Sequence, residues 1–141
     1  MPVTSSAEAT WEGDLAGGSG TVRPASGAFP ELALTWKQRA ETRESGTSPE
    51  ELIAAAHAGC FAMQLSGGLS GAGHKPERLD TRARVTFQPP EGITGIHLTV
   101  TGRVPGIDEA AFAAAVADAK ANCPVSKALA AVPITVDATL A

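Results

Sequence analysis

The amino-acid sequence predicts one domain of the α+β class over residues 1–141, with an antiparallel pair of strands after its first helix. Its 141 residues suit one domain with a proper hydrophobic core. Strand and helix patterns follow the order strands, helix, two strands, two helices, strand, and not a regular alternation of strand and helix. The two central strand patterns are joined by a short Pro-Pro-Glu-Gly connection, so these two strands must pair in an antiparallel manner.

The first third of the chain contains strand patterns that are separated by turn-forming residues. Residues 9–12, 21–23 and 32–39 are predicted strands, because Gly, Pro and Ser bound them. In the last of these, alternation places Leu34 and Trp36 on one face of the strand.

A helix start follows these strands. Ser48 suits the N-cap, Pro49 suits the first helical position, and Glu51 completes a capping box. The helix is predicted over residues 49–66, where the glycines at 67–68 can end it.

The remaining elements follow from alternation and from one further cap. Apolar residues alternate in two segments after this helix, which predicts the antiparallel pair of strands. Asp108 is the expected N-cap of the second helix. The predicted elements are strands at 79–88, 93–104 and 132–140 and helices at 108–121 and 124–131.

The 49–66 helix is apolar on every side after Glu51. A helix that is apolar all round must be buried all round. One curved sheet and two short helices are too few to enclose it. The sequence therefore predicts a homodimer in which elements of both chains cover this helix.

Composition excludes several classes of function. The formal net charge is -4 and no Lys/Arg cluster occurs, which argues against a nucleic-acid partner. The N-terminus lacks the basic and apolar regions of a signal peptide. The uncharged stretch 52–74 contains His57, Gln64 and several Gly, so it is a poor membrane span. We expect a soluble cytoplasmic protein without membrane association.

The two cysteines, Cys60 and Cys123, are the candidate reactive groups. Cytoplasmic thiols are kept reduced, so composition alone favours two inert buried cysteines. Cys123 lies at the start of a predicted helix, where N–H groups stabilise a thiolate, whereas Cys60 lies in the middle of an apolar helix. A reactive Cys60 therefore needs a cation nearby, for which Arg39, Arg43 and a protonated His57 are the candidates.

His57 precedes Cys60 by one helical turn, on the same face. A zinc site normally needs four ligands, and the sequence has only three His and no Cys-X-X-Cys pair, so no metal site is predicted. We interpret His57 as a core residue that bonds a backbone group.

The sequence resembles the OsmC/Ohr family of peroxidases, and its OsmC branch in particular. Four stretches carry the resemblance and span nearly the whole chain. They are Trp11-Glu12-Gly13-Asp14, the segment from Gly46-Thr47-Ser48-Pro49-Glu50-Glu51 to Gly59-Cys60-Phe61-Ala62-Met63, Val104-Pro105-Gly106-Ile107, and Cys123-Pro124-Val125-Ser126.

The resemblance implies a cysteine-based peroxidase that reduces organic hydroperoxides without a cofactor. It implies that Cys60 attacks the peroxide, that Cys123 resolves the product as a disulfide, and that an external dithiol restores both thiols. It also implies an arginine that holds the thiolate, matched best by Arg39 with Arg43 as rival, and a glutamate that pairs with it, matched by Glu50. The implied fold is an intertwined homodimer with antiparallel sheets around long central helices.

One geometric consequence follows from the helix. Glu50 and Cys60 are ten residues apart, which is about 15 Å along a helix axis. We therefore expect the Glu50 that serves a given Cys60 to come from the other subunit. The alternative function is a non-catalytic redox-sensing or small-ligand-binding module on the same fold.

Overall fold

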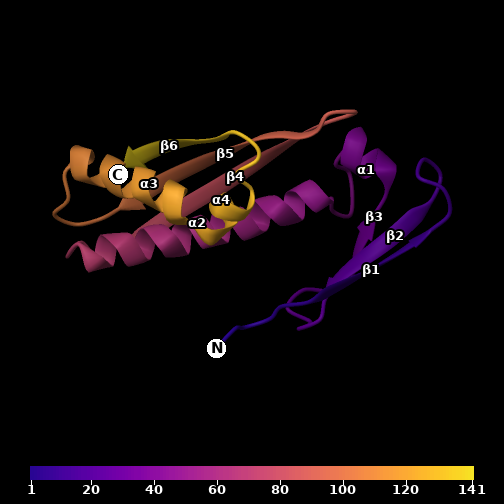
Figure 1. Cartoon of the computed structure of the whole chain (residues 1–141), viewed down its shortest axis with the longest axis horizontal. Helices are drawn as coiled ribbons and strands as arrows, with labels where there is room; N and C mark the ends of the chain where they lie inside the picture. Colours follow the sequence, from indigo (N-terminus) through magenta and orange to yellow (C-terminus); the bar gives the residue numbers. More distant parts are fainter. The chain divides into compact units, whose positions relative to one another are not determined.

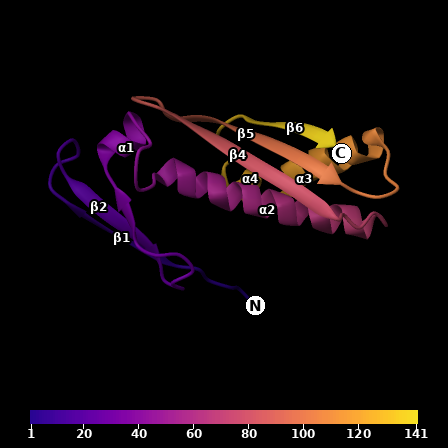
Figure 2. The same cartoon turned by 180° about the vertical axis from the view of Figure 1, so that it is seen from behind.

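The computed structural model describes all 141 residues, and the chain divides into two compact units, Met1–Leu52 and Ile53–Ala141. Figures 1 and 2 show the helices and strands of both units. The α+β class predicted from the order of elements is confirmed, because each unit combines strands and helix. A single domain over the whole chain stays a prediction.

The first unit is built on a small antiparallel sheet in the order β1-β2-β3. Helix α1 follows β3 directly, whereas the sequence pattern predicted that the strand would continue to residue 39. That prediction was wrong because the Thr35 hydroxyl accepts a hydrogen bond from the Gln38 N–H at 3.2 Å and caps a helix there. The elements are β1 (Ala7–Glu12), β2 (Ser19–Pro24), β3 (Leu32–Leu34) and α1 (Trp36–Ala40).

The N-terminus of helix α2 (Pro49–Gly71) forms as predicted, with one difference. The Ser48 Oγ accepts a hydrogen bond from the Glu51 N–H at 3.1 Å, which is the expected cap. The Glu51 carboxylate, however, accepts a hydrogen bond from the Thr47 hydroxyl at 2.7 Å instead of closing a capping box with the Ser48 N–H. Thr47 is itself tied to the first sheet, since its N–H donates to the Ala33 carbonyl at 2.9 Å.

The C-terminus of α2 lies beyond the predicted end at residue 66. Gly67 and Gly68 are helical, at a cost of about 1 kcal/mol each relative to alanine. Leu65 and Leu69 are buried on either side of them, and this tertiary packing outweighs the low helix propensity of glycine. The helix ends instead near Gly73, which has a φ of +87° in the left-handed region.

The second unit contains a mixed sheet in the order β4-β5-β6. Strands β4 and β5 pair in an antiparallel manner, as predicted, but β6 is parallel to β5. A parallel pair requires a crossover, and helices α3 and α4 supply it. Asp108 caps α3 as predicted, since its Oδ1 accepts from the Ala111 N–H at 2.7 Å. The elements are β4 (Arg78–Gln88), β5 (Gly92–Arg103), α3 (Glu109–Asn122), α4 (Pro124–Ala128) and β6 (Ile134–Leu140).

Helices α2 and α3 cover the same face of this sheet, as both views show. The sheet alternates between core and solvent along each strand, so its other face is exposed. A hydrogen bond from the Thr81 hydroxyl to the Ala58 carbonyl at 3.0 Å joins β4 to α2. The fully or nearly fully buried side chains of the core are Phe61, Leu65, Leu69, Ile96, Leu98, Val100, Val104, Phe112, Val116, Ala119 and Cys123.

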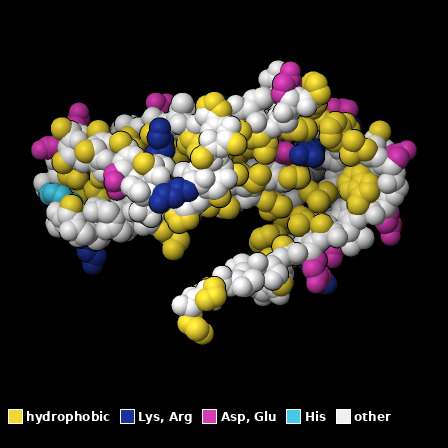
Figure 3. Space-filling model, viewed as in Figure 1, with side chains coloured by type: hydrophobic (Ala, Val, Ile, Leu, Met, Phe, Trp, Pro, Cys, Tyr) yellow, Lys and Arg dark blue, Asp and Glu magenta, His cyan; other side chains and the backbone are white.

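The opposite side of α2 stays exposed in the single chain, although the sequence predicts burial all round. Met63 is 78% exposed, and hydrophobic side chains are visible on the surface in Figure 3. By length and hydropathy alone, α2 could also cross a membrane, a property that core helices of globular proteins share. Its packing under the sheet through Phe61, Leu65 and Leu69 is that of a core helix with one uncovered side.

Candidate active site

The two cysteines of the second unit lie side by side. Cys60 is on α2, and Cys123 is the residue immediately before α4. Both are free thiols, and their Sγ atoms are 3.1 Å apart. Cys123 is fully buried, whereas Cys60 is partly exposed. The pair is therefore close enough to form a disulfide after a small movement, and the more accessible sulfur belongs to Cys60.

The surroundings of the two sulfurs favour a thiolate on Cys123. Burial raises the pKa of Cys60, and its hydrogen bond with Cys123 raises it further. Burial also raises the pKa of Cys123, but the neighbouring polar groups of Ser126, Cys60 and Val125 lower it by more. The pKa of Cys123 is therefore below its ordinary value. This order agrees with the one expected from the positions of the cysteines on their helices.

A second polar contact lies one helical turn from the sulfurs. The Nε2 atom of His57 is 2.7 Å from the Oγ atom of Ser126. The expectation that His57 bonds a backbone group was wrong, because its partner is this side-chain hydroxyl. The Nδ1 atom of His57 is buried without a hydrogen-bond partner, and burial lowers the pKa of the imidazole. Both effects favour the neutral form of His57.

The first unit brings Arg39 and Glu50 together. The Arg39 guanidinium donates to the Glu50 carboxylate through Nη2 at 2.8 Å and through Nε at 3.0 Å. Glu50 is 1% exposed, and 34% of the Arg39 side chain remains accessible. A buried carboxylate that receives two N–H groups fixes the plane of the guanidinium. The rival Arg43 donates instead to the Ser48 hydroxyl at 2.6 Å, at the start of α2.

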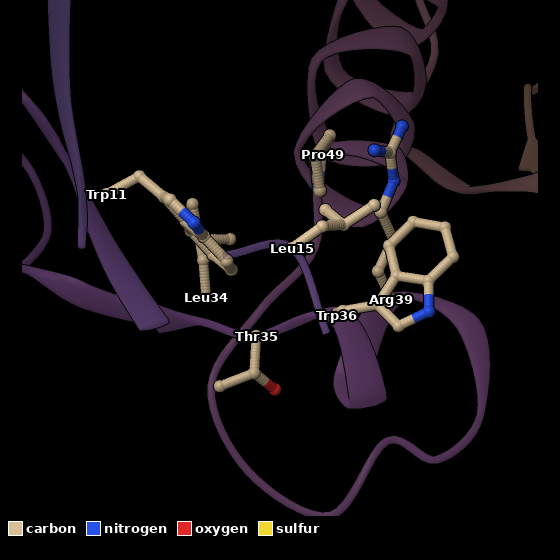
Figure 4. A pocket seen from close by; sticks show the side chains of 7 residues that line it. All are labelled: Trp11, Leu15, Leu34, Thr35, Trp36, Arg39 and Pro49. Carbon is tan, nitrogen blue, oxygen red and sulfur yellow. The ribbon is translucent and has the colours of Figure 1, made fainter. Parts of the chain in front are cut away.

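An apolar pocket of about 300 Å³ opens beside Arg39 within the first unit. Figure 4 shows the Trp36 indole beside the Arg39 side chain, with Trp11 and Leu34 together on the other side. The arginine is the only charged residue in the lining, which consists of Trp11, Leu15, Leu34, Thr35, Trp36, Arg39 and Pro49. The pocket can therefore take an apolar group and present it next to a guanidinium.

Sequence reasoning did not identify Ser126 or the pocket. Ser126 follows Cys123 at the same spacing by which Cys60 follows His57, and this matched three-residue spacing was the available signal. The pocket had no such signal, because it depends on Trp36 leaving the strand for helix α1. No group of three or more His, Cys, Asp or Glu side chains lies close enough together to hold a metal ion.

Comparisons with known proteins place these features in context. A family model described as OsmC-like protein matches residues 42–137. A protein named peroxiredoxin OsmC from Escherichia coli (strain K12) is 44% identical over 140 residues, which cover 97% of this chain and 96% of that protein.

Solved structures of low sequence identity share the fold. An organic hydroperoxide resistance protein OsmC from Legionella pneumophila has a TM-score of 0.68 at 22% identity, over 96% of each chain. An OsmC-like protein from Mycoplasma pneumoniae has a TM-score of 0.72 at 17% identity, over 99% of each chain. The organic hydroperoxide resistance protein OhrB of Bacillus subtilis has a TM-score of 0.65 at 22% identity, over 96% of this chain and 98% of that one.

Proposed function

Because the chain belongs to the family of OsmC-like proteins, we propose that it is a thiol-dependent peroxidase that reduces organic hydroperoxides to alcohols. The observation that carries the proposal is the pair of reduced sulfurs, 3.1 Å apart with one of them accessible. The name of the relative from Escherichia coli and those of the solved organic hydroperoxide resistance proteins agree with this chemistry.

The reaction begins at the partly exposed sulfur, Cys60. Its thiolate attacks one peroxide oxygen, the O–O bond breaks, and the released alkoxide takes up a proton to become the alcohol. The product on the protein is a Cys60 sulfenic acid. Cys123 then attacks that sulfur, the S–O bond breaks, and the hydroxide leaves as water after protonation. An external dithiol reduces the resulting Cys60–Cys123 disulfide by exchange. No step requires a metal or an organic cofactor.

The second unit by itself does not prepare Cys60 for the first step. No Lys or Arg of residues 53–141 contributes to its pKa, and both burial and Cys123 keep its proton in place. A guanidinium from elsewhere must therefore draw the negative charge onto Cys60 and stabilise the departing alkoxide. We assign this role to Arg39, because the buried Glu50 orients its guanidinium while a third of its side chain stays accessible. Arg43 is a weaker candidate, because it is engaged at the N-cap of α2.

Distance along α2 favours an arginine from the partner subunit. The Glu50 that holds Arg39 is ten residues from Cys60 on the same helix, which corresponds to about 15 Å. A homodimer in which the Arg39–Glu50 pair of one chain serves Cys60 of the other removes this separation. The exposed apolar side of α2, which includes Met63, supports the same homodimer, because a partner subunit would remove this apolar surface from water.

The pocket beside Arg39 supports organic hydroperoxides as the substrate class. Its lining is apolar apart from the guanidinium, so an alkyl or aryl group gains free energy by leaving water there. Hydrogen peroxide has no such group and would gain nothing. The proposal includes a cytoplasmic location, where dithiol reductants are available.

The proposal is tested by following the loss of cumene hydroperoxide with a dithiol in excess. The wild type should turn over steadily, and Cys60→Ser should reduce turnover to the uncatalysed rate. Cys123→Ser should consume about one equivalent rapidly and then stall or over-oxidise, because no resolving thiol remains. Steady turnover by Cys60→Ser would overturn the assignment of roles. Absence of turnover by the wild type, with any of several dithiols, would favour a redox-sensing module instead.

A further inference from the structure

Two helices place two matched pairs of side chains opposite each other. His57 and Cys60 are one turn apart on α2, and Ser126 and Cys123 are one turn apart at the start of α4. The sulfurs meet at 3.1 Å, and one turn away the His57 Nε2 meets the Ser126 Oγ at 2.7 Å. The imidazole contact therefore lies one turn from the sulfur contact, and Ser126, which carries the hydroxyl, follows Cys123 by one turn and is among the groups that lower the Cys123 pKa.

Packing alone does not explain a histidine at this position. His57 is 0% exposed, and its Nδ1 atom has no hydrogen-bond partner. A buried polar atom without a partner is unfavourable, so an aliphatic residue of similar size would suit the core better. The contact between Nε2 and Ser126 is the one feature that an aliphatic residue could not supply.

The two tautomers of neutral His57 orient the Ser126 hydroxyl differently. With its hydrogen on Nε2, His57 donates to the Ser126 Oγ, and the hydroxyl hydrogen is left to point at the Cys123 sulfur. With its hydrogen on Nδ1, His57 accepts the hydroxyl hydrogen, and the sulfur receives none. Only the first tautomer stabilises a Cys123 thiolate, because a thiolate accepts hydrogen bonds and does not donate them.

We propose that His57 acts through Ser126 as a positioning residue that directs a hydroxyl hydrogen onto the Cys123 sulfur and so prepares Cys123 to close the disulfide. The inference rests on the proposed function. In the step, an electron pair of the Cys123 thiolate forms the bond to the Cys60 sulfur, and the S–O bond of the sulfenic acid breaks. The hydroxide that leaves takes up a proton equivalent to the one that Cys123 has shed, which gives water.

This role is local, because no Lys, Arg, Asp or Glu is among the causes that set the pKa values of His57, Cys60 and Cys123 in the chain. Under the proposed function, Arg39 of the assembled site acts on Cys60. Removing the Ser126 hydroxyl therefore leaves the arginine in place, and it takes away both the group that acts on Cys123 and the partner of the His57 Nε2 atom.

The first experiment titrates Cys123 by thiolate absorbance in full-length protein that carries Cys60→Ser, so that Cys123 is the only thiol. Ser126→Ala or His57→Leu should raise the Cys123 pKa by about one pH unit, which corresponds to about tenfold less thiolate at neutral pH. His57→Gln, whose amide can donate to Ser126, should restore most of the difference. The matched control is Thr135→Val, which removes the hydroxyl from the exposed His97–Thr135 pair at 2.6 Å.

The second experiment mixes the two-cysteine protein rapidly with one equivalent of cumene hydroperoxide. Sulfenic acid is trapped with a dione, and the disulfide is measured by mass spectrometry. Ser126→Ala should close the disulfide about tenfold more slowly at neutral pH, and the pH profile of closure should move to higher pH. Formation of the sulfenic acid should not slow, because less charge on Cys123 favours charge on Cys60.

Unchanged Cys123 titration in Ser126→Ala overturns the inference, whether or not His57→Leu folds. The inference is also overturned if His57→Leu closes the disulfide slowly without a shift of the pH profile and His57→Gln closes it equally slowly. That result would indicate a merely structural histidine. If the proposed function is wrong, the wild type forms no sulfenic acid with hydroperoxide in the second experiment. The titration of Cys123 in the first experiment still decides the role of His57.

Discussion

The ionisable side chains of the two units have different kinds of partners. In the first unit, the buried Glu50 carboxylate forms an ion pair with Arg39, with 2.8 Å between Glu50 Oε1 and Arg39 Nη2. In the second unit, the thiols of Cys60 and Cys123 receive only hydrogen bonds, and no cation of that unit contributes to their pKa values. The charged pair is thus complete within one unit, whereas the sulfur pair lacks the cation that its proposed chemistry requires.

This difference gives the two units different roles in the proposed mechanism. A guanidinium that is held by a buried carboxylate has a fixed orientation. In the proposed mechanism the sulfurs supply the redox chemistry, and their surroundings favour the thiolate of Cys123. The proposed first step, attack by Cys60, would then depend on Arg39, and the second step would depend on the groups that surround Cys123.

The largest expected effect comes from removing the cation. Arg39→Ala should lower kcat/KM for cumene hydroperoxide by about 10²- to 10³-fold, because it removes the group that stabilises both thiolate and alkoxide. Arg43→Ala, the matched control, should change kcat/KM by less than about threefold. Steady-state kinetics with a dithiol in excess measure both. Because Arg39→Ala leaves a buried carboxylate unpaired, Arg39→Ala/Glu50→Gln should be measured too, with folding checked by circular dichroism.

Equal losses for the two arginine variants would contradict the assignment of Arg39. A normal kcat/KM in Arg39→Ala/Glu50→Gln would show that the Arg39–Glu50 pair does not contribute to catalysis.

Mixing two inactive variants tests whether the cation comes from the partner subunit. Cys60→Ser and Arg39→Ala chains, unfolded and refolded together in equal amounts, should regain about a quarter of wild-type activity. The reason is that half of the dimers are then mixed, and each mixed dimer has one site with both Cys60 and Arg39. Each variant refolded alone is the control. No recovery in samples shown by mass spectrometry to contain mixed dimers would place Arg39 and Cys60 of one site in the same chain.

A third effect concerns the exposed side of α2. Met63→Glu should shift the protein from dimer to monomer in sedimentation analysis, since it places a charge on an apolar surface that the proposed homodimer covers. Ala117→Glu, on the exposed side of α3, is the control and should leave the mass unchanged. A wild type that sediments as a monomer at all concentrations would refute the homodimer itself.

The smallest effect is a pH dependence of stability that originates from the second unit. Burial lowers the pKa of His57 in the folded chain below the value of about 6.5 found for an unburied histidine. The unfolded chain therefore binds the proton first as the pH falls, and stability decreases below about pH 6.5 by up to about 1.4 kcal/mol per pH unit. Urea unfolding at several pH values should show a weaker decrease in His57→Gln than in the wild type. Parallel curves for the two proteins would contradict this origin.

Local sequence determined much of what is seen in both units. The cap at Ser48 and the cap at Asp108 were predicted because each depends on a side chain and an N–H group only three residues away. The antiparallel pairing of β4 and β5 followed from a connection too short to allow any other. The family resemblance rested likewise on short motifs around Cys60 and Cys123.

Contacts between distant residues decided the rest. Helix α2 continues past Gly67 and Gly68 because Leu65 and Leu69 are buried in the core of the second unit. Helix propensities of single residues do not include the free energy of this burial. The 3.1 Å between the sulfurs and the 2.7 Å between His57 and Ser126 join residues more than sixty positions apart. Sequence alone thus identified the candidate reactive residue types and predicted their helices, whereas tertiary structure decided which atoms meet, because packing and burial depend on all the neighbours that folding brings together.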